Sequence, residues 1–191
     1  MPARPPLPTP HPALKVSVVV PARNEEALVG SCLEALAEQE GVSPEEYEVL
    51  LVLDRCTDET EPRAREIADA HPRFRLHFLD GPGKGSGHAR RMGMELASAR
   101  LLGLRRPKGL IASTDADTVV APDWLAAQLR AVSRGALAVG DASSSPRTPP
   151  YRRVSFAGTP SGAVADMKAS SPSPSTWAKP NIGSSVAPPS P

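Results

Sequence analysis

The stretch Leu110-Ile-Ala-Ser-Thr-Asp-Ala-Asp-Thr-Val-Val120 decides how the rest of this 191-residue sequence is interpreted. Its first five residues, an apolar run with β-branched members, predict a buried strand. Asp115 and Asp117 follow directly, at the carboxyl end of that strand, where open α/β sheets bind their ligands. Two carboxylates one residue apart can direct oxygen atoms at one point, which suits a divalent cation that also holds phosphate oxygens. A metal site for a phosphorylated substrate is therefore the first hypothesis. A solvated turn or helix entry is the alternative, because aspartate is common in loops.

The charge balance and the cysteine content argue against several classes of protein. Lysine and arginine number 22 against 21 aspartates and glutamates, which leaves a formal charge of +1 and gives no indication of nucleic acid as a partner. Cys32 and Cys56 form neither a Cys-x-x-Cys pair nor a disulfide framework, so we expect a cytoplasmic location. The sequence has no signal-peptide core and no apolar run of about 18 residues, so we expect no transmembrane segment.

Alternating strand and helix patterns predict an α/β domain with a mostly parallel sheet flanked by helices. A proline-rich lead, residues 1–13, comes first, and we expect it to be disordered. Strands are predicted at residues 16–20, 47–53, 75–79, 110–114 and 136–139. Helices are predicted at residues 25–40, from a cap at Thr57 or Asp58 to residue 70, at residues 86–104, and from Pro122 onward. Three polar loops, 23–26, 54–58 and 115–117, then lie at carboxyl ends of strands.

A glycine-rich loop, residues 81–87, follows the third predicted strand and precedes a long helix. It is not a P-loop, because glycine rather than serine or threonine follows its Gly-Lys pair. It is not a dinucleotide fingerprint either, since no acidic residue lies about 20 residues further on. The loop can still present Lys84 and Arg90 or Arg91 to an anion at a helix amino terminus. A solvated linker with surface arginines is the alternative.

Residues 143–191 differ in composition from everything before them. Serine and proline supply 22 of these 49 residues, and Asp166 is their only acidic residue. One interpretation is a Ser/Pro-rich disordered tail that cannot bury enough apolar surface to fold. A second interpretation, which we favour, is that the reading frame is lost near residue 142, because a shifted GC-rich frame tends to encode such residues. Genomic resequencing distinguishes the two.

Four sequence blocks stand in an order and at a spacing that are specific in combination. They are Val-Ser-Val-Val-Val-Pro-Ala-Arg-Asn-Glu-Glu at 16–26, Val-Leu-Leu-Val-Leu-Asp-Arg-Cys-Thr-Asp-Glu-Thr at 49–60, Gly-Lys-Gly-Ser-Gly-His-Ala-Arg at 83–90, and Thr-Asp-Ala-Asp at 114–117. Together they resemble family 2 glycosyltransferases of the GT-A fold, which is related to the Rossmann fold. The resemblance implies an incomplete GT-A nucleotide-sugar-binding domain at residues 14–142.

The resemblance also implies roles for individual residues. Around the nucleoside it places Pro21, Ala22, Arg23 and Glu25, with Asp54 hydrogen-bonding the base. Around the rest of the donor it places Lys84, Arg90 or Arg91, and Asp115, which would contact the ribose or the sugar. Asp117 would bind Mg²⁺ or Mn²⁺ bridging the diphosphate. The implied activity is metal-assisted, inverting transfer of a sugar from a nucleotide-diphosphate sugar to an unknown acceptor.

The sequence departs from the family in two places. Arg55-Cys-Thr-Asp58 replaces a more usual small, acidic loop. Inverting members carry a carboxylate general base in their second half, but none of the acids after Asp117, namely Asp123, Asp141 and Asp166, has a matching context. We therefore assign no base. A non-catalytic nucleotide-sugar-binding fragment or pseudoenzyme is the first alternative, and a nucleotidyltransferase is the second.

Overall fold

The computed structural model describes residues 4–141 and 153–157, with backbone alone for residues 140, 141 and 153–157. The chain divides into two units, residues 1–159 and 160–191, and all described residues belong to the first. Its core is a six-stranded sheet in the order β3-β2-β1-β4-β6-β5. The strands are β1 (Val16–Ala22), β2 (Tyr47–Leu53), β3 (Leu76–Asp80), β4 (Leu110–Ser113), β5 (Ala138–Asp141) and β6 (Arg153–Ala157). The predicted α/β class, with a mostly parallel sheet, is confirmed.

The first four strands form the parallel part of the sheet, with β1 at its centre. β1 pairs with β2 on one side, from Val16 opposite Tyr47 onward, and with β4 on the other, where Val16 lies opposite Leu110. Every residue of β1 and β2 is buried, as expected for strands covered on both faces. β3 forms one edge of the sheet and, among the described strands, pairs with β2 alone.

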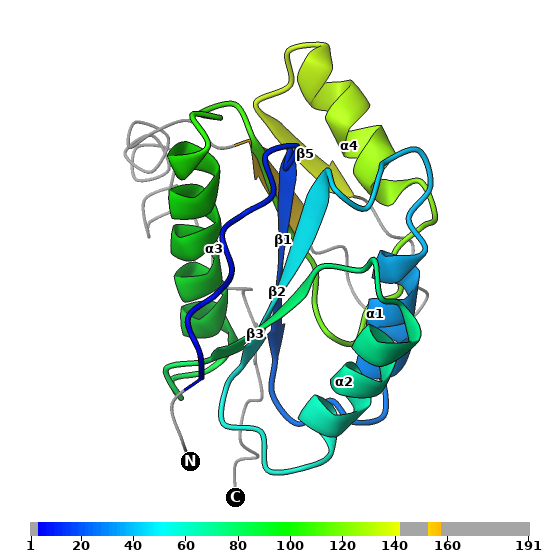
Figure 1. Cartoon of the computed structure of the whole chain (residues 1–191), viewed down its shortest axis with the longest axis vertical. Helices are drawn as coiled ribbons and strands as arrows, with labels where there is room; N and C mark the ends of the chain where they lie inside the picture. Colours follow the sequence, from blue (N-terminus) through cyan, green and yellow to red (C-terminus); the bar gives the residue numbers. More distant parts are fainter. Residues whose placement is uncertain (1–3, 142–152, 158–191) are drawn as a thin grey trace, which may run out of the picture. The chain divides into compact units, whose positions relative to one another are not determined.

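Helices cover both faces of this sheet (Figure 1). On one face α1 (Val29–Ala37), α2 (Thr60–Ala70) and α4 (Trp124–Ser133) contribute to one hydrophobic cluster with β1 and β2. On the other face α3 (Ser86–Gly103) packs alone, close enough that a Cβ atom on Gly93 would lie 2.4 Å from Val19 Cγ1. In the described part of the chain, no helix has both the length and the apolar composition needed to cross a bilayer.

Helix α1 is shorter than predicted at its amino end. The periodic pattern indicated a helix from residue 25, but the structure keeps residues 23–28 in a loop and begins α1 at Val29. The reason is tertiary: this loop is hydrogen-bonded to the loop after β2, as described below. Loop residues 23–28 lie at the carboxyl edge of the sheet, where the candidate site is.

The amino-terminal segment differs from the predicted disordered lead. Residues 4–13 run beside α3 (Figure 1), and their carbonyl oxygens accept hydrogen bonds from two arginines of the α3 region. Arg100 Nη1 donates to the Pro8 oxygen over 2.9 Å, and Arg106 Nη2 to the Pro12 oxygen over 2.8 Å. Proline lacks a backbone N–H group but keeps its carbonyl, so a proline-rich segment can still be held as an acceptor. The composition of this segment could not indicate these hydrogen bonds, because the donor arginines lie about 90 residues away along the chain.

Strand β6 lies inside the segment that was predicted to be a tail without regular structure. It pairs antiparallel with β4, Leu110 opposite Ala157, and with β5, Val139 opposite Ser155. For residues 153–157 the structure therefore differs from the prediction. The prediction rested on the overall serine and proline content and overlooked residues 153–157, in which polar and apolar residues alternate. The strands that pair with this segment, β4 and β5, precede it in the sequence. The rest of the predicted tail lies outside the described residues.

Candidate functional site

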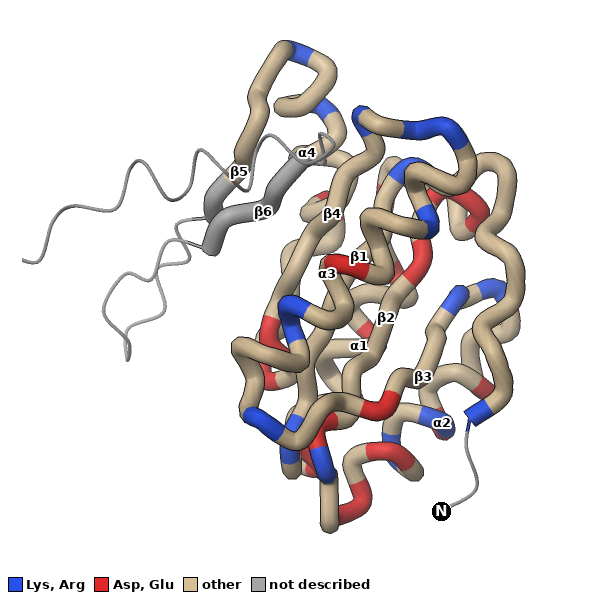
Figure 2. The backbone as a smooth tube through the Cα atoms, turned by 90° about the vertical axis from the view of Figure 1, so that its left-hand side faces the viewer, with Lys and Arg blue, Asp and Glu red and all other residues tan. Residues whose placement is uncertain are grey.

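The candidate site lies at the carboxyl edge of the parallel strands, the lower end of the molecule in Figures 1 and 2. Four connections meet there: residues 23–28 after β1, 54–59 after β2, 81–85 after β3 and 114–123 after β4. Acidic and basic positions lie close together at this edge (Figure 2). The net charge of the whole chain is only +1, so any electrostatic attraction of a ligand to this edge depends on these local groups.

The loops after β1 and β2 are joined by hydrogen bonds. Asn24 Oδ1 accepts from the Thr57 backbone N–H over 2.9 Å, and the Glu25 N–H donates to Thr60 Oγ1 over 2.8 Å. Asn24 has φ 56°, in the left-handed region that asparagine tolerates better than most residues. Thr60 is fully buried at the start of α2. Sequence reasoning missed both side chains, because their partners lie in a different loop.

Asp58 completes the connection between these two loops. Its Oδ1 accepts from Thr60 Oγ1 over 2.6 Å, and its Oδ2 accepts from the Glu26 N–H over 3.1 Å. Burial alone would raise the pKa of Asp58, but the hydrogen bonds from the Thr60 hydroxyl and the backbone N–H groups outweigh it and lower the pKa. Asp58 Oδ1 also accepts from the Thr60 N–H over 3.1 Å, but the N-cap of α2 is Glu59, so the predicted cap at Thr57 or Asp58 is wrong.

Asp54, expected from the resemblance to contact a base, lies under the glycine-rich loop instead. Only 1% of its surface is exposed. Its Oδ1 accepts from the Gly83 N–H over 2.5 Å, and its Oδ2 accepts from the Gly85 N–H over 2.8 Å. In this structure the carboxylate therefore accepts a backbone hydrogen bond on each oxygen, and the hydrogen bond to a base that the resemblance implies stays a prediction.

The two candidate arginines of α3 point in different directions. Arg90 reaches across to the end of β4, where its Nε donates to Ser113 Oγ over 3.0 Å and its Nη2 forms an ion pair with Asp115. Arg91 lies on the exposed side of α3 and pairs with Glu95 one turn further on, over 2.8 Å. The sequence left Arg90 and Arg91 as alternatives. The structure brings Arg90 to the site and places Arg91 away from it, because adjacent helical residues diverge by about 100°.

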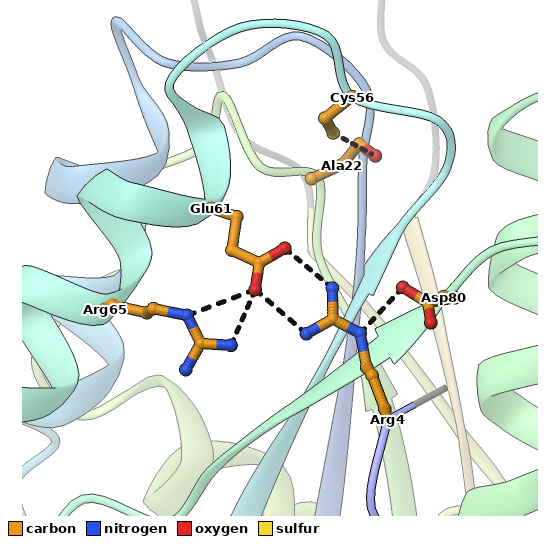
Figure 3. Close-up of polar contacts among 6 residues, drawn as sticks. All are labelled: Arg4, Ala22, Cys56, Glu61, Arg65 and Asp80. Atoms are coloured by element: carbon orange, nitrogen blue, oxygen red, sulfur yellow. Dashed lines mark hydrogen bonds and ion pairs between the residues drawn. The ribbon is translucent and has the colours of Figure 1, made fainter. Parts of the chain in front are cut away.

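The remaining donor-binding candidates lie at the end of β1, in the loop after it and in the glycine-rich loop. Pro21 and Ala22 are buried in β1, and the Ala22 carbonyl accepts from the Asp54 N–H over 2.8 Å and from Cys56 Sγ over 3.5 Å (Figure 3). Arg23 and Lys84 are exposed. Pro21 and Ala22 therefore contribute backbone and shape, whereas Arg23 and Lys84 offer charge.

Four carboxylates, those of Glu25, Asp58, Asp115 and Asp117, lie close enough together to interact electrostatically. Burial, followed by the charges of Asp117, Asp58 and Asp115, raises the pKa of Glu25. Asp117 is exposed, and Thr118 Oγ1 donates to its Oδ1 over 3.3 Å. Among the residues that the structure describes, no group of three His, Cys, Asp or Glu side chains is arranged to hold a metal ion by itself. An exposed Asp117 beside other carboxylates fits a Mg²⁺ or Mn²⁺ ion that takes one or two protein ligands and completes its shell with phosphate oxygens.

Of the acids that follow Asp117, the structure describes the side chain of Asp123. Asp123 is exposed and pairs with Arg130 over 2.8 Å on the surface of α4. The side chain of Asp141 and all of Asp166 lie outside the described residues. Among the side chains that the structure describes, we assign no general base.

A hollow of about 440 Å³ opens beside the Asp54 loop, between the ends of β2 and β3 and the start of α2. Its wall includes an ion-pair network around Arg4, which donates to both Glu61 oxygens over 2.9 and 2.6 Å and to Asp80 over 2.7 Å (Figure 3). The guanidinium of Arg4, together with that of Arg65, lowers the pKa of Glu61 to about 2. No sequence signal pointed to Arg4, since its partners are 57 and 76 residues away.

Residues 17–161 match the sequence profile of Glycosyl transferase family 2. The chain belongs to this family. The match begins in β1, takes in every strand of the sheet and extends past residue 142, so it includes β6. Loss of the reading frame near residue 142 remains a hypothesis that genomic resequencing tests.

Known proteins of related sequence or structure are longer than this chain. It is 32% identical over 125 residues to a dolichyl-phosphate beta-glucosyltransferase of Drosophila melanogaster, across 59% of this chain and 38% of the relative. A mannosyltransferase from Pyrobaculum calidifontis, in complex with GDP-Man and Mn²⁺, superposes with a TM-score of 0.56 at 24% identity over 78% of this chain and 46% of that one. TarS of S. aureus gives a TM-score of 0.55 at 20% identity over 71% of this chain and 23% of TarS. These structural similarities support the GT-A fold, and the chain spans less than half the length of each protein.

Proposed function

We propose that this chain binds a nucleotide-diphosphate sugar at the carboxyl edge of its sheet and takes part in metal-assisted, inverting transfer of the sugar to an acceptor. The observation that carries the proposal is the arrangement at the end of β4. Asp115 forms an ion pair with Arg90 there, and Asp117 is exposed near Glu25. Strands β1 and β2 end at the same edge of the sheet. Open α/β sheets bind ligands at such an edge.

The proposed donor orientation follows from where charge is exposed. Arg23 and Glu25, with the backbone of Pro21 and Ala22, line the nucleoside side of the site. Lys84 offers a cation to the diphosphate from the glycine-rich loop. Asp115, oriented by Arg90, faces the ribose or the sugar.

Asp117 is the proposed ligand for Mg²⁺ or Mn²⁺. When bound, such an ion neutralises negative charge that grows on the departing nucleoside diphosphate. The raised pKa of Glu25 supports the assignment, because a cation beside Asp117 would relieve the repulsion among these carboxylates. A mannosyltransferase of similar fold is known in complex with GDP-Man and Mn²⁺.

A second candidate function is donor binding without turnover. It is favoured by Asp123, which pairs with Arg130 rather than standing free to accept a proton.

The metal assignment is tested by replacing Asp117. We expect Asp117→Ala to abolish the dependence of nucleotide affinity on Mn²⁺ in calorimetric titration, while the matched control Asp123→Ala retains it. Unchanged Mn²⁺ dependence in Asp117→Ala would show that the metal binds elsewhere. Release of nucleoside diphosphate with a candidate acceptor then separates an active transferase from a binding protein.

A further inference from the structure

The glycine-rich loop is fixed by Asp54 at two points. The buried carboxylate accepts from the backbone N–H groups of Gly83 and Gly85, one on each oxygen. Just before them, the Gly81 N–H donates to the Leu53 carbonyl over 2.7 Å and continues the pairing between β2 and β3. A buried carboxylate needs such donors, because an unpaired charge there would be strongly unfavourable.

Gly81 and Gly83 each lie very close to a residue of the loop after β2, namely Asp54 and Arg55. A Cβ atom on Gly81 would lie 2.7 Å from Asp54 Oδ1 and 2.8 Å from its Cα atom. A Cβ atom on Gly83, which has φ 69°, would lie 2.1 Å from Arg55 Nε. The Arg55 side chain therefore packs against Gly83, while the Asp54 carboxylate binds the backbone of the same loop. Arg55 has φ 58°, in the left-handed region. The glycines provide close approach to this pair as well as backbone freedom.

The loop also sets the start of α3. The Gly85 carbonyl accepts from the N–H groups of His88 and Ala89, both over 3.1 Å, so the residue that Asp54 holds begins the helix. Ala89 is buried, and the next residue is Arg90, which reaches Ser113 and Asp115. A continuous series of contacts therefore leads from Asp54 to the end of β4.

We propose that Asp54 is a positioning residue that acts on the donor through the glycine-rich loop rather than by contacting the base. Together with Arg55 it orders the loop before any ligand binds, and so places Lys84 and Arg90 for the donor. The effect of Asp54 on donor binding rests on the proposed function, but the ordering of the glycine-rich loop is a property of the unliganded protein. It explains why the carboxylate is buried and why Gly81 and Gly83 lack side chains.

The ordering is tested by amide exchange in the absence of ligand, followed by NMR. In the wild type we expect the amides of Gly83 and Gly85 to be protected and that of Gly87, in the first turn of α3 without an intrahelical acceptor, to exchange fast. Asp54→Asn, whose amide can serve as acceptor at one oxygen only, should accelerate exchange at Gly83 or Gly85 by about tenfold or more. The matched control Asp80→Asn removes a carboxylate that binds Arg4 next to the loop, and should leave both amides unchanged.

Nucleotide affinity distinguishes positioning from base contact. If Asp54 acts through the loop, Asp54→Asn weakens UDP and GDP by the same factor. A changed ratio of the two affinities, or Gly83 and Gly85 amides that exchange in the wild type as fast as that of Gly87, would overturn the proposal. If Asp54→Asn does not fold, the wild-type exchange pattern decides. If the wild type binds no nucleotide, the proposed function fails, and exchange alone decides whether Asp54 holds the loop.

Discussion

Replacing Glu48 by glutamine tests how the α3 face of the sheet is held together. Glu48 lies in β2 with 1% of its surface exposed, and its carboxylate accepts from Arg100 Nε over 2.8 Å and Nη2 over 2.6 Å. Ser17 Oγ donates to it over 3.1 Å, and His77 Nε2 lies 3.5 Å away. Burial would raise the pKa of Glu48, but hydrogen bonds from Arg100 and His77 and their charges outweigh it and lower the pKa to about 2.

The magnitude follows from that pKa. A fall from 4.5 to about 2 corresponds to about 3 kcal/mol of folding stability at neutral pH. Both partners of the ion pair are buried, so solvent screening removes little of this free energy. Removing one partner of a buried pair destabilises proteins by about 3–5 kcal/mol. We therefore expect Glu48→Gln to lower the free energy of unfolding by about 3 kcal/mol.

The assay is urea unfolding followed by circular dichroism. The control is Glu46→Gln, which breaks the more exposed pair with Lys15 and should lower the free energy of unfolding by less than about 1 kcal/mol. Because the folded pKa of Glu48 is depressed, its stabilisation is present above pH 4.5 and is lost as the pH falls towards 2. The wild type should lose this contribution over that range and the variant should not. A Glu48→Gln variant within 1 kcal/mol of the wild type, with a parallel pH profile, would refute the reasoning.

Three further predictions concern α3 and the site. Gly93→Ala should destabilise the fold by about 1–3 kcal/mol, because the added Cβ atom would lie 2.4 Å from Val19 Cγ1. The control Gly103→Ala should not destabilise the fold, because its Cβ atom would have no neighbour within 4 Å. Thermal unfolding compares the two variants. Asn24→Ala should weaken nucleotide binding and lower stability by about 1–2 kcal/mol, because it removes the acceptor for the Thr57 N–H in a left-handed conformation; equal affinity in calorimetry would contradict this. Arg90→Gln should weaken donor binding at least about tenfold, whereas Arg91→Gln should leave it unchanged; equal effects would contradict the assignment of Arg90 to the site.

Most of the fold could be predicted from local sequence. The fully buried strand Tyr47–Leu53 was predicted with its observed bounds, because a β-branched and aliphatic run between polar loops has few other interpretations. The start of α3 at Ser86 was also correct, since the glycines before it end any regular pattern. The amino-terminal segment and β6 were not predictable, because both are held by partners distant in sequence.

The candidate site was predictable in place but not in detail. Asp115 and Asp117 at the end of β4 follow from the strand pattern alone. The burial of Asp54 under the glycine-rich loop and the choice of Arg90 over Arg91 depend on how loops and α3 pack, which no local pattern records. The cytoplasmic location expected from the cysteine content stays a prediction.

The most direct test of the account is calorimetric titration of the folded wild-type chain with UDP-sugars and GDP-sugars, with and without Mn²⁺. The account predicts that at least one nucleotide sugar binds, and that Mn²⁺ raises its affinity, because the diphosphate and Asp117 share the ion. Binding of neither class by a chain that circular dichroism shows to be folded would contradict a donor site at this edge of the sheet. Binding that is indifferent to Mn²⁺ would contradict the metal assignment to Asp117.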